Sequence, residues 1–171
     1  MGRAAGIRCR IGGELMPTAF QPDDVMSGLI TTLAAALNAA DIDTEDIGEA
    51  QIDDNDQLVL QMPCARPRYV ESSYRALDTT ATSYETQHIF EIWCAAENLT
   101  SKSAQRSATR QIVGQVIAAL AGTRIPVEDK TGETSEPASI AAVGQMPEDV
   151  LGMIYIVRVT VPGIAQFTPP E

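Results

Sequence analysis

Apolar residues recur at helical spacing in two parts of the chain. Between residues 22 and 40, one apolar stripe predicts an amphipathic helix, made of Met26, Leu29, Ile30, Leu33 and Leu37. Between residues 101 and 121, a second stripe predicts another helix, and Gly122 is placed to end it in the left-handed conformation. The apolar residues of this helix lie in its second half, so we expect its first half to project past the core.

A strand pattern is clearest in residues 84–96. Phe90, Ile92 and Cys94 share one face of that segment, while Ile89 and Trp93 share the other. Because both faces carry large apolar side chains, we expect this strand to be central in a sheet and covered on both sides.

Other segments give weaker strand signals. We expect short strands at residues 57–62 and 124–127, and a last strand at residues 151–161 that ends before Pro162. Residues 64–83 are interpreted as a strand pair with a long, exposed connection.

The order of these elements favours an α+β fold, with one mixed, mostly antiparallel sheet and two main helices packed on it. Residues 128–150, rich in Gly, Pro, Ser and acidic residues, are expected to form a long loop. The length of 171 residues suits one domain. We therefore divide the chain into an N-terminal arm (1–20), a single α+β domain (21–162) and a C-terminal tail (163–171).

The charge of the chain is uneven. Its formal net charge is −11, and residues 41–56 hold eight carboxylates without a Lys or Arg. A chain of this sign is unsuited to nucleic-acid binding by phosphate neutralisation. No run of about 18 apolar residues is present, so no membrane span is expected. The three cysteines are odd in number and widely spaced, which indicates free thiols rather than a disulfide framework.

The sequence offers little support for catalysis. His88, the single histidine, and Cys94 are about 20 Å apart along one strand face, too far for a nucleophile–base pair or a shared zinc ion. We expect His88 to be a hydrogen-bonded or surface histidine. Residues 128–130 (Glu-Asp-Lys) are similar to the acidic-x-Lys element of metal-dependent nucleases. A small metal-dependent nuclease or hydrolase that uses clustered carboxylates is therefore the alternative from another functional class.

The acidic run also imitates a calcium loop. Asp41, Asp43 and Glu45 match the first ligands of an EF-hand, but Asp and Ile occupy the loop positions that need a Gly and a bidentate Glu. We therefore expect no metal, no cofactor and no catalytic residue, and interpret the run as an acidic surface.

Basic and aromatic residues mark two candidate interaction surfaces. Lys102, Arg106 and Arg110 recur every four residues on the projecting half of the second helix, where they form either a solvated edge or a contact with carboxylates of a neighbouring subunit. The second candidate is the segment 66–84, because Tyr and Arg are enriched at binding hot spots. An ordinary exposed loop is the alternative there. The candidate residues of this second surface are Arg66, Arg68, Tyr69, Tyr74 and Arg75.

Four features follow one another within residues 88–125. They are an aromatic–apolar strand (Phe90-Glu91-Ile92-Trp93), an Asn98-Leu99 step, the helical arginines Arg106 and Arg110, and a Leu120-Ala121-Gly122 end. This stretch resembles a family of small tail proteins encoded by Mu-like phages and prophages. Outside it, the resemblance extends only to the order of the elements.

The resemblance implies a tail terminator, also called a tail completion protein, which has no active site. In that group an α+β subunit forms a hexameric ring that caps the tail tube and offers a surface to the head connector. The implied partners are further copies of the chain, the tail tube protein, the head connector or completion protein, and DNA in transient, non-specific passage. The implied location is the head-proximal end of the virion tail, after assembly in the bacterial cytoplasm. A head–tail connector or another minor tail protein is the alternative within this class.

In such a ring, we hypothesise that the acidic run lines the lumen. Negative charge there would repel DNA phosphates and let the genome slide. The residues concerned are Asp41, Asp43, Glu45, Asp46, Asp53, Asp54 and Asp56.

Overall fold

A computed structural model describes residues 20–37, 41–49, 51–52, 58–77, 83–97, 101–127, 134–146 and 153–166. Its helices are α1 (Pro22–Leu37), α2 (Lys102–Leu120) and a short 3-10 helix, η2 (Ile47–Glu49). Its strands are β1 (Gln51–Ile52), β2 (Leu58–Val59), β3 (Cys64–Ala76), β4 (Ser83–Ala95), β5 (Arg124–Pro126), β6 (Thr134–Pro137), β7 (Ser139–Gln145) and β8 (Tyr155–Gln166).

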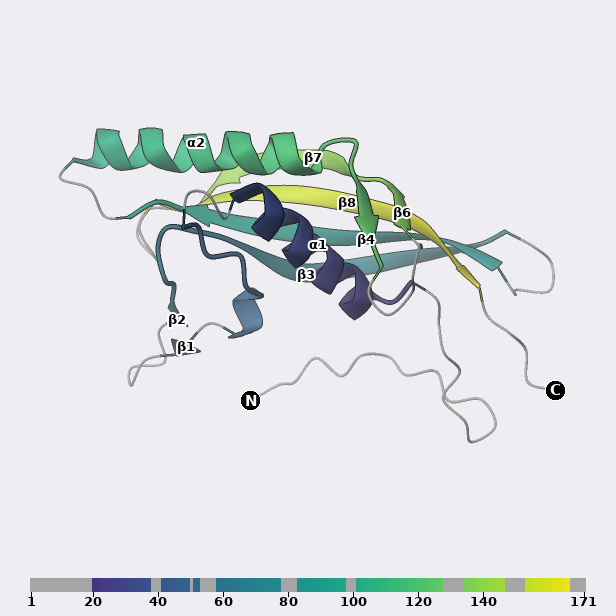
Figure 1. Ribbon diagram of the computed structural model, residues 1–171. Coiled ribbons are helices and arrows are strands. Elements are labelled where there is room, and N and C mark those ends of the chain that lie inside the picture. The colour runs from purple at the N-terminus through teal and green to yellow at the C-terminus, as the bar shows by residue number, and fades with distance from the viewer. Residues whose placement is uncertain are drawn as a thin grey trace.

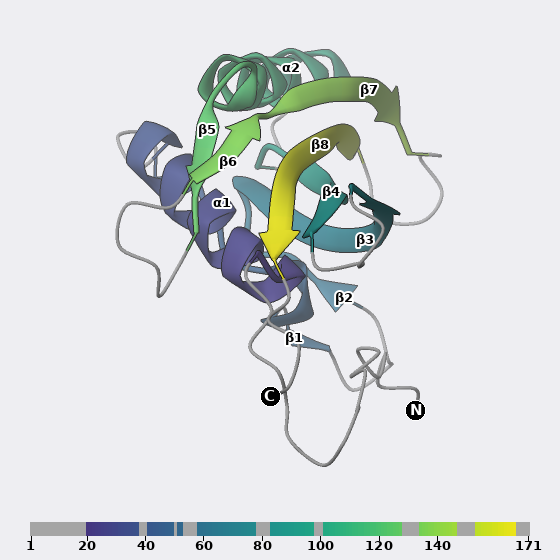
Figure 2. The same ribbon diagram turned by 90° about the vertical axis from the view of Figure 1, so that its right-hand side faces the viewer.

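The main sheet has four antiparallel strands in the order β3-β4-β8-β7. Both helices lie on the same side of this sheet (Figures 1 and 2), where α2 packs on β8 and β4 while α1 packs on β3. Two small pairs, β1-β2 and β5-β6, complete the described strands. The arrangement is the α+β fold that the element order predicts, and β4 is a central strand as expected.

The first helix forms where the apolar stripe predicts it. Pro22 opens α1, and Asp23 and Asp24 in its first turn suit the positive end of the helix dipole. The stripe is buried against the sheet except for Ile30, which is half-buried, and Gly28 is buried with it. A Cβ at Gly28 would lie 1.8 Å from the carbonyl oxygen of Pro126, so only glycine permits this approach of α1 to β5.

The second helix has defined signals at both ends. The Ser101 hydroxyl accepts a hydrogen bond from the Ala104 N–H (3.1 Å) and caps the N-terminus. Gly122 follows the C-terminus with a φ of 75°, as expected for a left-handed stop. No residue of α2 before Thr109 is buried, and the buried residues run from there to Leu120. The prediction that only the second half of this helix packs on the core is confirmed.

The strand β4 has apolar contacts on both of its faces. Phe90, Ile92 and Cys94 face the helices in the main core. On the other face, Trp93 joins a smaller buried cluster, against which η2 and the residues after β2 pack. The expectation of a covered central strand is therefore confirmed for the end of β4 that contains Trp93.

Two predictions about the second half of the chain are wrong. Residues 128–150 are not one long loop, because β6 and β7 lie within them. The last strand does not end at residue 161: β8 continues through Pro162 to Gln166 and pairs with β4 along that length. β7 pairs with β8 only as far as Thr160, so among the described strands none pairs with β8 on that side of Pro162, where a proline is tolerated.

The ends of the expected domain also shift. Residues 163–166 belong to β8 rather than to a C-terminal tail. Phe20, placed in the N-terminal arm, is buried in the core, whereas residues 1–19 lie outside the described part of the chain. Of the strand expected at 57–62, only Leu58–Val59 (β2) is a strand, which pairs with β1. None of the described helices is long and apolar enough to cross a membrane.

Candidate functional site

The β3–β4 hairpin carries the residues of the second candidate surface, and a one-residue bulge in β3 sorts them between two faces. Tyr69 pairs with Phe90 and Tyr74 pairs with Thr86, so both tyrosines are on the helix side of the sheet. In a regular strand, two residues five positions apart would be on opposite faces. The register shift between Tyr69 and Glu71 adds one residue and brings the two tyrosines to the same face.

The tyrosine surface consists of Tyr69, Ser72 and Tyr74, with His88 buried beneath them. Tyr69 is 40% exposed and Tyr74 is 51% exposed. Their rings rest on buried neighbours, with 5.9 Å between the centroids of Tyr69 and Phe90 and 6.2 Å between those of Tyr74 and His88. The hairpin extends beyond the ends of both helices in Figure 1. The surface is therefore aromatic and exposed, and its two tyrosine rings pack against the buried side chains of Phe90 and His88.

A directed chain of hydrogen bonds fixes this surface to the core. Nε2 of His88 lies 3.0 Å from the carbonyl oxygen of Phe20, which can only accept, so Nε2 carries the proton. Nδ1 of His88 then accepts from the Ser72 hydroxyl (2.5 Å). The Ser72 oxygen in turn accepts from the Tyr69 hydroxyl (2.9 Å). The expectation that His88 is a hydrogen-bonded histidine is confirmed.

Burial lowers the pKa of His88 below its ordinary value of 6.5, and the hydrogen bond to Phe20 partly offsets this effect. His88 is therefore neutral at pH 7, which agrees with an Nδ1 that accepts. The hydrogen bond from Ser72 to His88 resembles the one that joins a catalytic serine to its histidine base. We interpret the pair as structural, because its hydrogen bonds join the two strands of the hairpin to each other and, through Nε2 of His88, to the carbonyl oxygen of Phe20.

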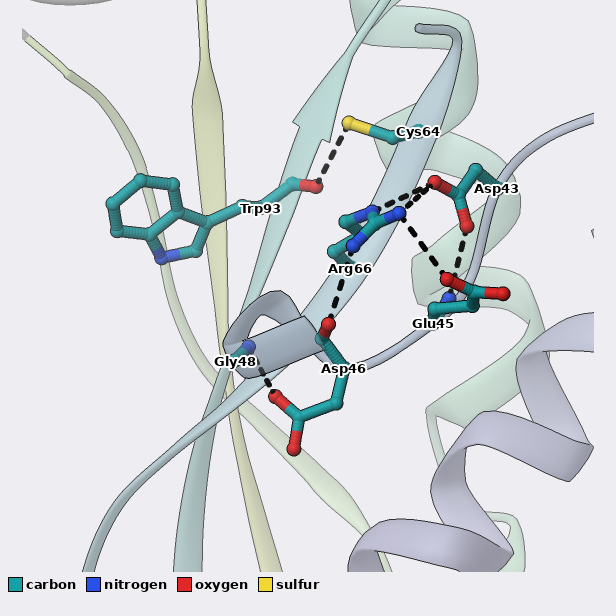
Figure 3. Close-up of polar contacts among 7 residues, drawn as sticks. All are labelled: Asp43, Glu45, Asp46, Gly48, Cys64, Arg66 and Trp93. Atoms are coloured by element: carbon teal, nitrogen blue, oxygen red, sulfur yellow. Dashed lines mark hydrogen bonds and ion pairs between the residues drawn. The ribbon is translucent and has the colours of Figure 1, made fainter. Parts of the chain in front are cut away.

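Arg66, a predicted interface residue, is instead buried at the start of β3 (Figure 3), where it is 5% exposed. Its Nε donates to Oδ2 of Asp43 (2.7 Å), and its Nη2 also binds that oxygen. Nη1 donates to the backbone oxygen of Asp46 (3.2 Å), and Nη2 lies 3.4 Å from Oε2 of Glu45. The guanidinium therefore holds the acidic segment 41–49 against the sheet.

The backbone reinforces this attachment. Asp43 forms a parallel bridge with Cys64, in which the Ala65 N–H donates to the Asp43 carbonyl (2.7 Å). Arg66, predicted as a partner-binding residue, is thus not available at the surface of the folded chain, since it is buried and its donors are used within the chain. Asp43 is likewise neutralised by Arg66 and is not a free lumen charge. Their pairing spans 23 positions, which no local pattern indicates.

The other two arginines of the hairpin lie on the face opposite the tyrosines. Arg68 is exposed, with its Cζ 5.8 Å from the centroid of the Trp93 ring. Arg75 is exposed and lies 3.7 Å from Oε2 of Glu85. On the same face, Arg158 binds Glu91 at 2.6 Å. This side of the sheet therefore has mixed charges, and the five predicted interface residues do not form one surface.

Two of the three basic residues on this edge of α2, Lys102 and Arg110, are exposed. Lys102 is exposed in the first turn, and Arg106 is half-buried. Arg110 contacts Tyr155 of β8, with its Nε 3.3 Å from the hydroxyl and its Cζ 5.9 Å from the ring centroid. The contact of this edge with a neighbouring subunit stays a prediction.

The described part of the acidic run contains Asp41, Glu45 and Asp46 besides Asp43. Asp41 and Glu45 are exposed, and Asp46 accepts from the Gly48 N–H (2.8 Å). Asp53, Asp54 and Asp56 lie outside the described residues, as do residues 128–130 of the nuclease alternative. Within the described ranges, no three His, Cys, Asp or Glu side chains gather closely enough to hold a metal ion.

The described cysteines are free thiols, as the odd count predicts. Cys64 and Cys94 are both buried, and burial raises the pKa of the Cys64 thiol to about 11 and that of Cys94 still further. Thiols in this state are unreactive, and Cys9 lies outside the described residues.

Sequence reasoning missed two features of these surfaces. The Phe20–His88 contact joins residues 68 positions apart, and local spacing gives no sign of it. One property of the sequence could have indicated β7: residues 137–146 contain no ionisable side chain, although the chain as a whole is strongly acidic. No protein-family model matches the chain, and the search of curated proteins found no match.

Proposed function

We propose that the protein is a structural component of a phage virion, a tail terminator or tail completion subunit. Its copies form a ring that caps the tail tube and presents a surface to the head connector. The resemblance in residues 88–125 supports this proposal, because these residues build one unit of the fold. They supply most of the central strand β4 and all of α2, which packs on it.

The tyrosine surface is the observation that carries the proposal. Tyrosine is enriched at binding hot spots because it offers a large contact area at a low cost in conformational entropy. Tyr69 is further ordered by its bond to Ser72, so less of its freedom remains to be lost on binding. A projecting, pre-ordered aromatic surface suits contact with another protein, here the tail tube protein or the head connector.

The acidic run has a place in this proposal. Asp41 and Glu45 are exposed, and we place them in the lumen, where their charge repels DNA phosphates and prevents the genome from binding. A structure of the ring with this run on the outer rim would contradict the placement.

Electron microscopy of the purified full-length chain tests the ring directly, with native mass spectrometry for the number of copies. We expect closed rings. A chain that stays monomeric at concentrations of about 100 μM, far above those of tight assemblies, would contradict a ring-forming subunit.

The tyrosine surface is tested in phage production, with Tyr69→Ala and Tyr74→Ala combined in the virion. We expect at least tenfold fewer joined heads and tails, counted on micrographs. The matched control combines Ser73→Ala and Gln87→Ala, two exposed positions on the opposite face of the same hairpin. Equal joining by the two double variants would show that the tyrosines do not bind a partner.

The alternatives separate by location and by chemistry. A terminator is expected on tails made without heads, whereas a connector is expected on heads made without tails, and an antibody to this chain distinguishes them. A nuclease or hydrolase would cleave plasmid DNA when Mg²⁺ or Mn²⁺ is added to the purified chain. Metal-dependent cleavage that copurifies with the chain would overturn the structural role.

A further inference from the structure

The strand β7 forms one edge of the main sheet, and its outer side has no partner strand among the described residues. Six of its seven residues are exposed, including Val143 at 47%. Edge strands of soluble proteins are usually protected by charges, prolines or bulges that prevent pairing with other chains. β7 has one irregularity of this kind, between Ile140 and Ala142, but it pairs regularly with β8 from Ala142 to Gln145. It has no such charge, because residues 137–146 contain no ionisable side chain.

The opposite edge of the sheet is β3, and its two halves differ. Asp43 covers the outer side of the first residues of β3, and Pro67 and the bulge after Tyr69 interrupt the next ones. After the bulge, residues 71–76 form a regular strand that pairs only with β4 among the described segments. This second half is the part of the β3 edge that can accept another strand. It is about 20 Å long, enough to cover the regular part of β7, residues 142–145. Its two charged residues, Glu71 and Arg75, have opposite signs, so this half-strand has no net charge.

Strand direction makes these two edges compatible between copies. The sheet has four strands that alternate in direction, so β3 and β7 run antiparallel to each other. A rotation about an axis nearly parallel to the strands preserves their direction. Placing β7 of one copy beside β3 of the next therefore continues the antiparallel alternation without a break.

We propose that β7 of one copy pairs antiparallel with residues 71–76 of β3 in the next copy, so that the sheets of successive subunits form one continuous sheet. The occupant of each edge is a second copy of this chain. This inference rests on the proposed ring, because a cyclic assembly requires two different, complementary surfaces on every subunit.

Charge favours this contact over other faces of the subunit. Two copies that each carry a formal charge of −11 repel, and the repulsion is weakest where the facing side chains are neutral. β7 supplies a neutral strand, and the backbone hydrogen bonds that it offers do not depend on side-chain type.

Cysteine cross-linking of the full-length chain, in a Cys9→Ser background, tests the pairing. On the face opposite the helices, Ala142 and Gly144 of β7 are each replaced by Cys and combined with Cys at Glu71, Ser73 or Arg75 of β3. A Cβ at Gly144 meets no atom within 4 Å, so this position tolerates the change. After mild oxidation, we expect at least one combination to give a ladder of covalent oligomers up to the ring number.

Two controls define the result. Each single variant is expected to stay monomeric on a denaturing gel, and Ala142→Cys combined with Gln87→Cys, on the central strand, is expected to give no ladder. Dimers from Ala142→Cys or Gly144→Cys alone would show that β7 pairs with itself and would overturn the inference.

The micrographs of the same samples separate this inference from the proposed function. Rings without any ladder place the subunit contact elsewhere, so the pairing is refuted while the ring stands. A ladder with open filaments supports the pairing and refutes ring closure. If neither rings nor a ladder is observed, both the pairing and the proposed ring are refuted.

Discussion

At the scale of single residues, three arginines of β3 have three different environments. Arg66 is buried and bound by a carboxylate and a backbone oxygen, Arg68 lies over Trp93, and Arg75 is exposed beside Glu85. Removing one partner of a buried ion pair is costly because the other charge stays buried without compensation, whereas removing one partner of an exposed pair costs little. Arg66 is therefore expected to affect stability, and Arg75 is not.

Arg66→Ala leaves Asp43, whose side chain is 13% exposed, without its cation. We expect the free energy of unfolding to fall by about 3 kcal/mol, measured by urea denaturation. Arg68→Ala removes only a cation–π contact at the surface and is expected to cost at most about 1 kcal/mol. Equal losses in the two variants would contradict the structural role assigned to Arg66.

His88 predicts a pH dependence of stability. Its pKa is lowered on folding, so the unfolded chain binds the proton more tightly than the folded one. The stabilisation by neutral His88 is complete above the unfolded pKa of about 6.5 and is lost as the pH falls below it. We expect the urea midpoint to decrease between pH 7.5 and pH 5.5, above the range of about 4 in which ordinary carboxylates titrate.

The matched variant is His88→Gln, which keeps a donor for the Phe20 carbonyl but does not titrate. Since the chain has a single histidine, the decrease over this pH range is expected to disappear in the variant. If the variant loses stability on acidification as steeply as the wild type, His88 is not the group responsible.

At the scale of elements, packing decides what a helical glycine does. Gly28 and Gly114 are both helical, but a Cβ at Gly28 would overlap the backbone of Pro126, whereas a Cβ at Gly114 meets nothing within 4 Å. We expect Gly28→Ala to destabilise the protein by several kcal/mol, at about the upper end for single substitutions. Gly114→Ala is expected to stabilise it by about 0.5–1 kcal/mol. Thermal unfolding of both variants checks the opposite signs.

The elements with strong periodicity were predictable from sequence, and those held by distant contacts were not. α1, α2 and β4 bury regular apolar patterns, so their extents follow from spacing. Three of the seven residues of β7 are Ala or Gly, which have low strand propensity, and the pairing of β7 with β8 overrides that preference. For the candidate site, the Tyr and Arg content indicated the segment 66–84, but the strand pair expected within residues 64–83 is wrong, because β3 is one strand that pairs with β4. The bulge between Tyr69 and Glu71 and the Asp43–Arg66 pair depend on tertiary register.

At the scale of the whole molecule, charge and assembly are linked. One copy of the chain has a formal charge of −11, so bringing copies together would cost electrostatic free energy. Two kinds of contact respond oppositely to salt. A neutral strand contact leaves only the general repulsion to be screened, whereas a contact between the α2 cations and a neighbour's carboxylates is itself weakened by screening.

We therefore predict that added salt promotes assembly. Raising the ionic strength from about 0.01 M to about 0.1 M shortens the screening length from about 30 Å to about 10 Å. The concentration needed for half-assembly is expected to fall, as measured by light scattering or sedimentation. If salt dissociates the assembly instead, the attraction between Lys102, Arg106, Arg110 and a neighbour's acidic residues dominates. Charge reversal at Arg106 and Arg110 would then abolish it.

The bulge in β3 restricts which sequence changes this hairpin can tolerate. One extra residue in β3 decides whether aromatic or charged side chains lie on the helix side of the sheet in residues 71–76. Many substitutions in residues 71–76 would alter the chemistry of one face and leave the other intact. An insertion or deletion of a single residue near Val70 would exchange the two faces at once. The number of residues in this strand is therefore under a stricter constraint than their identity.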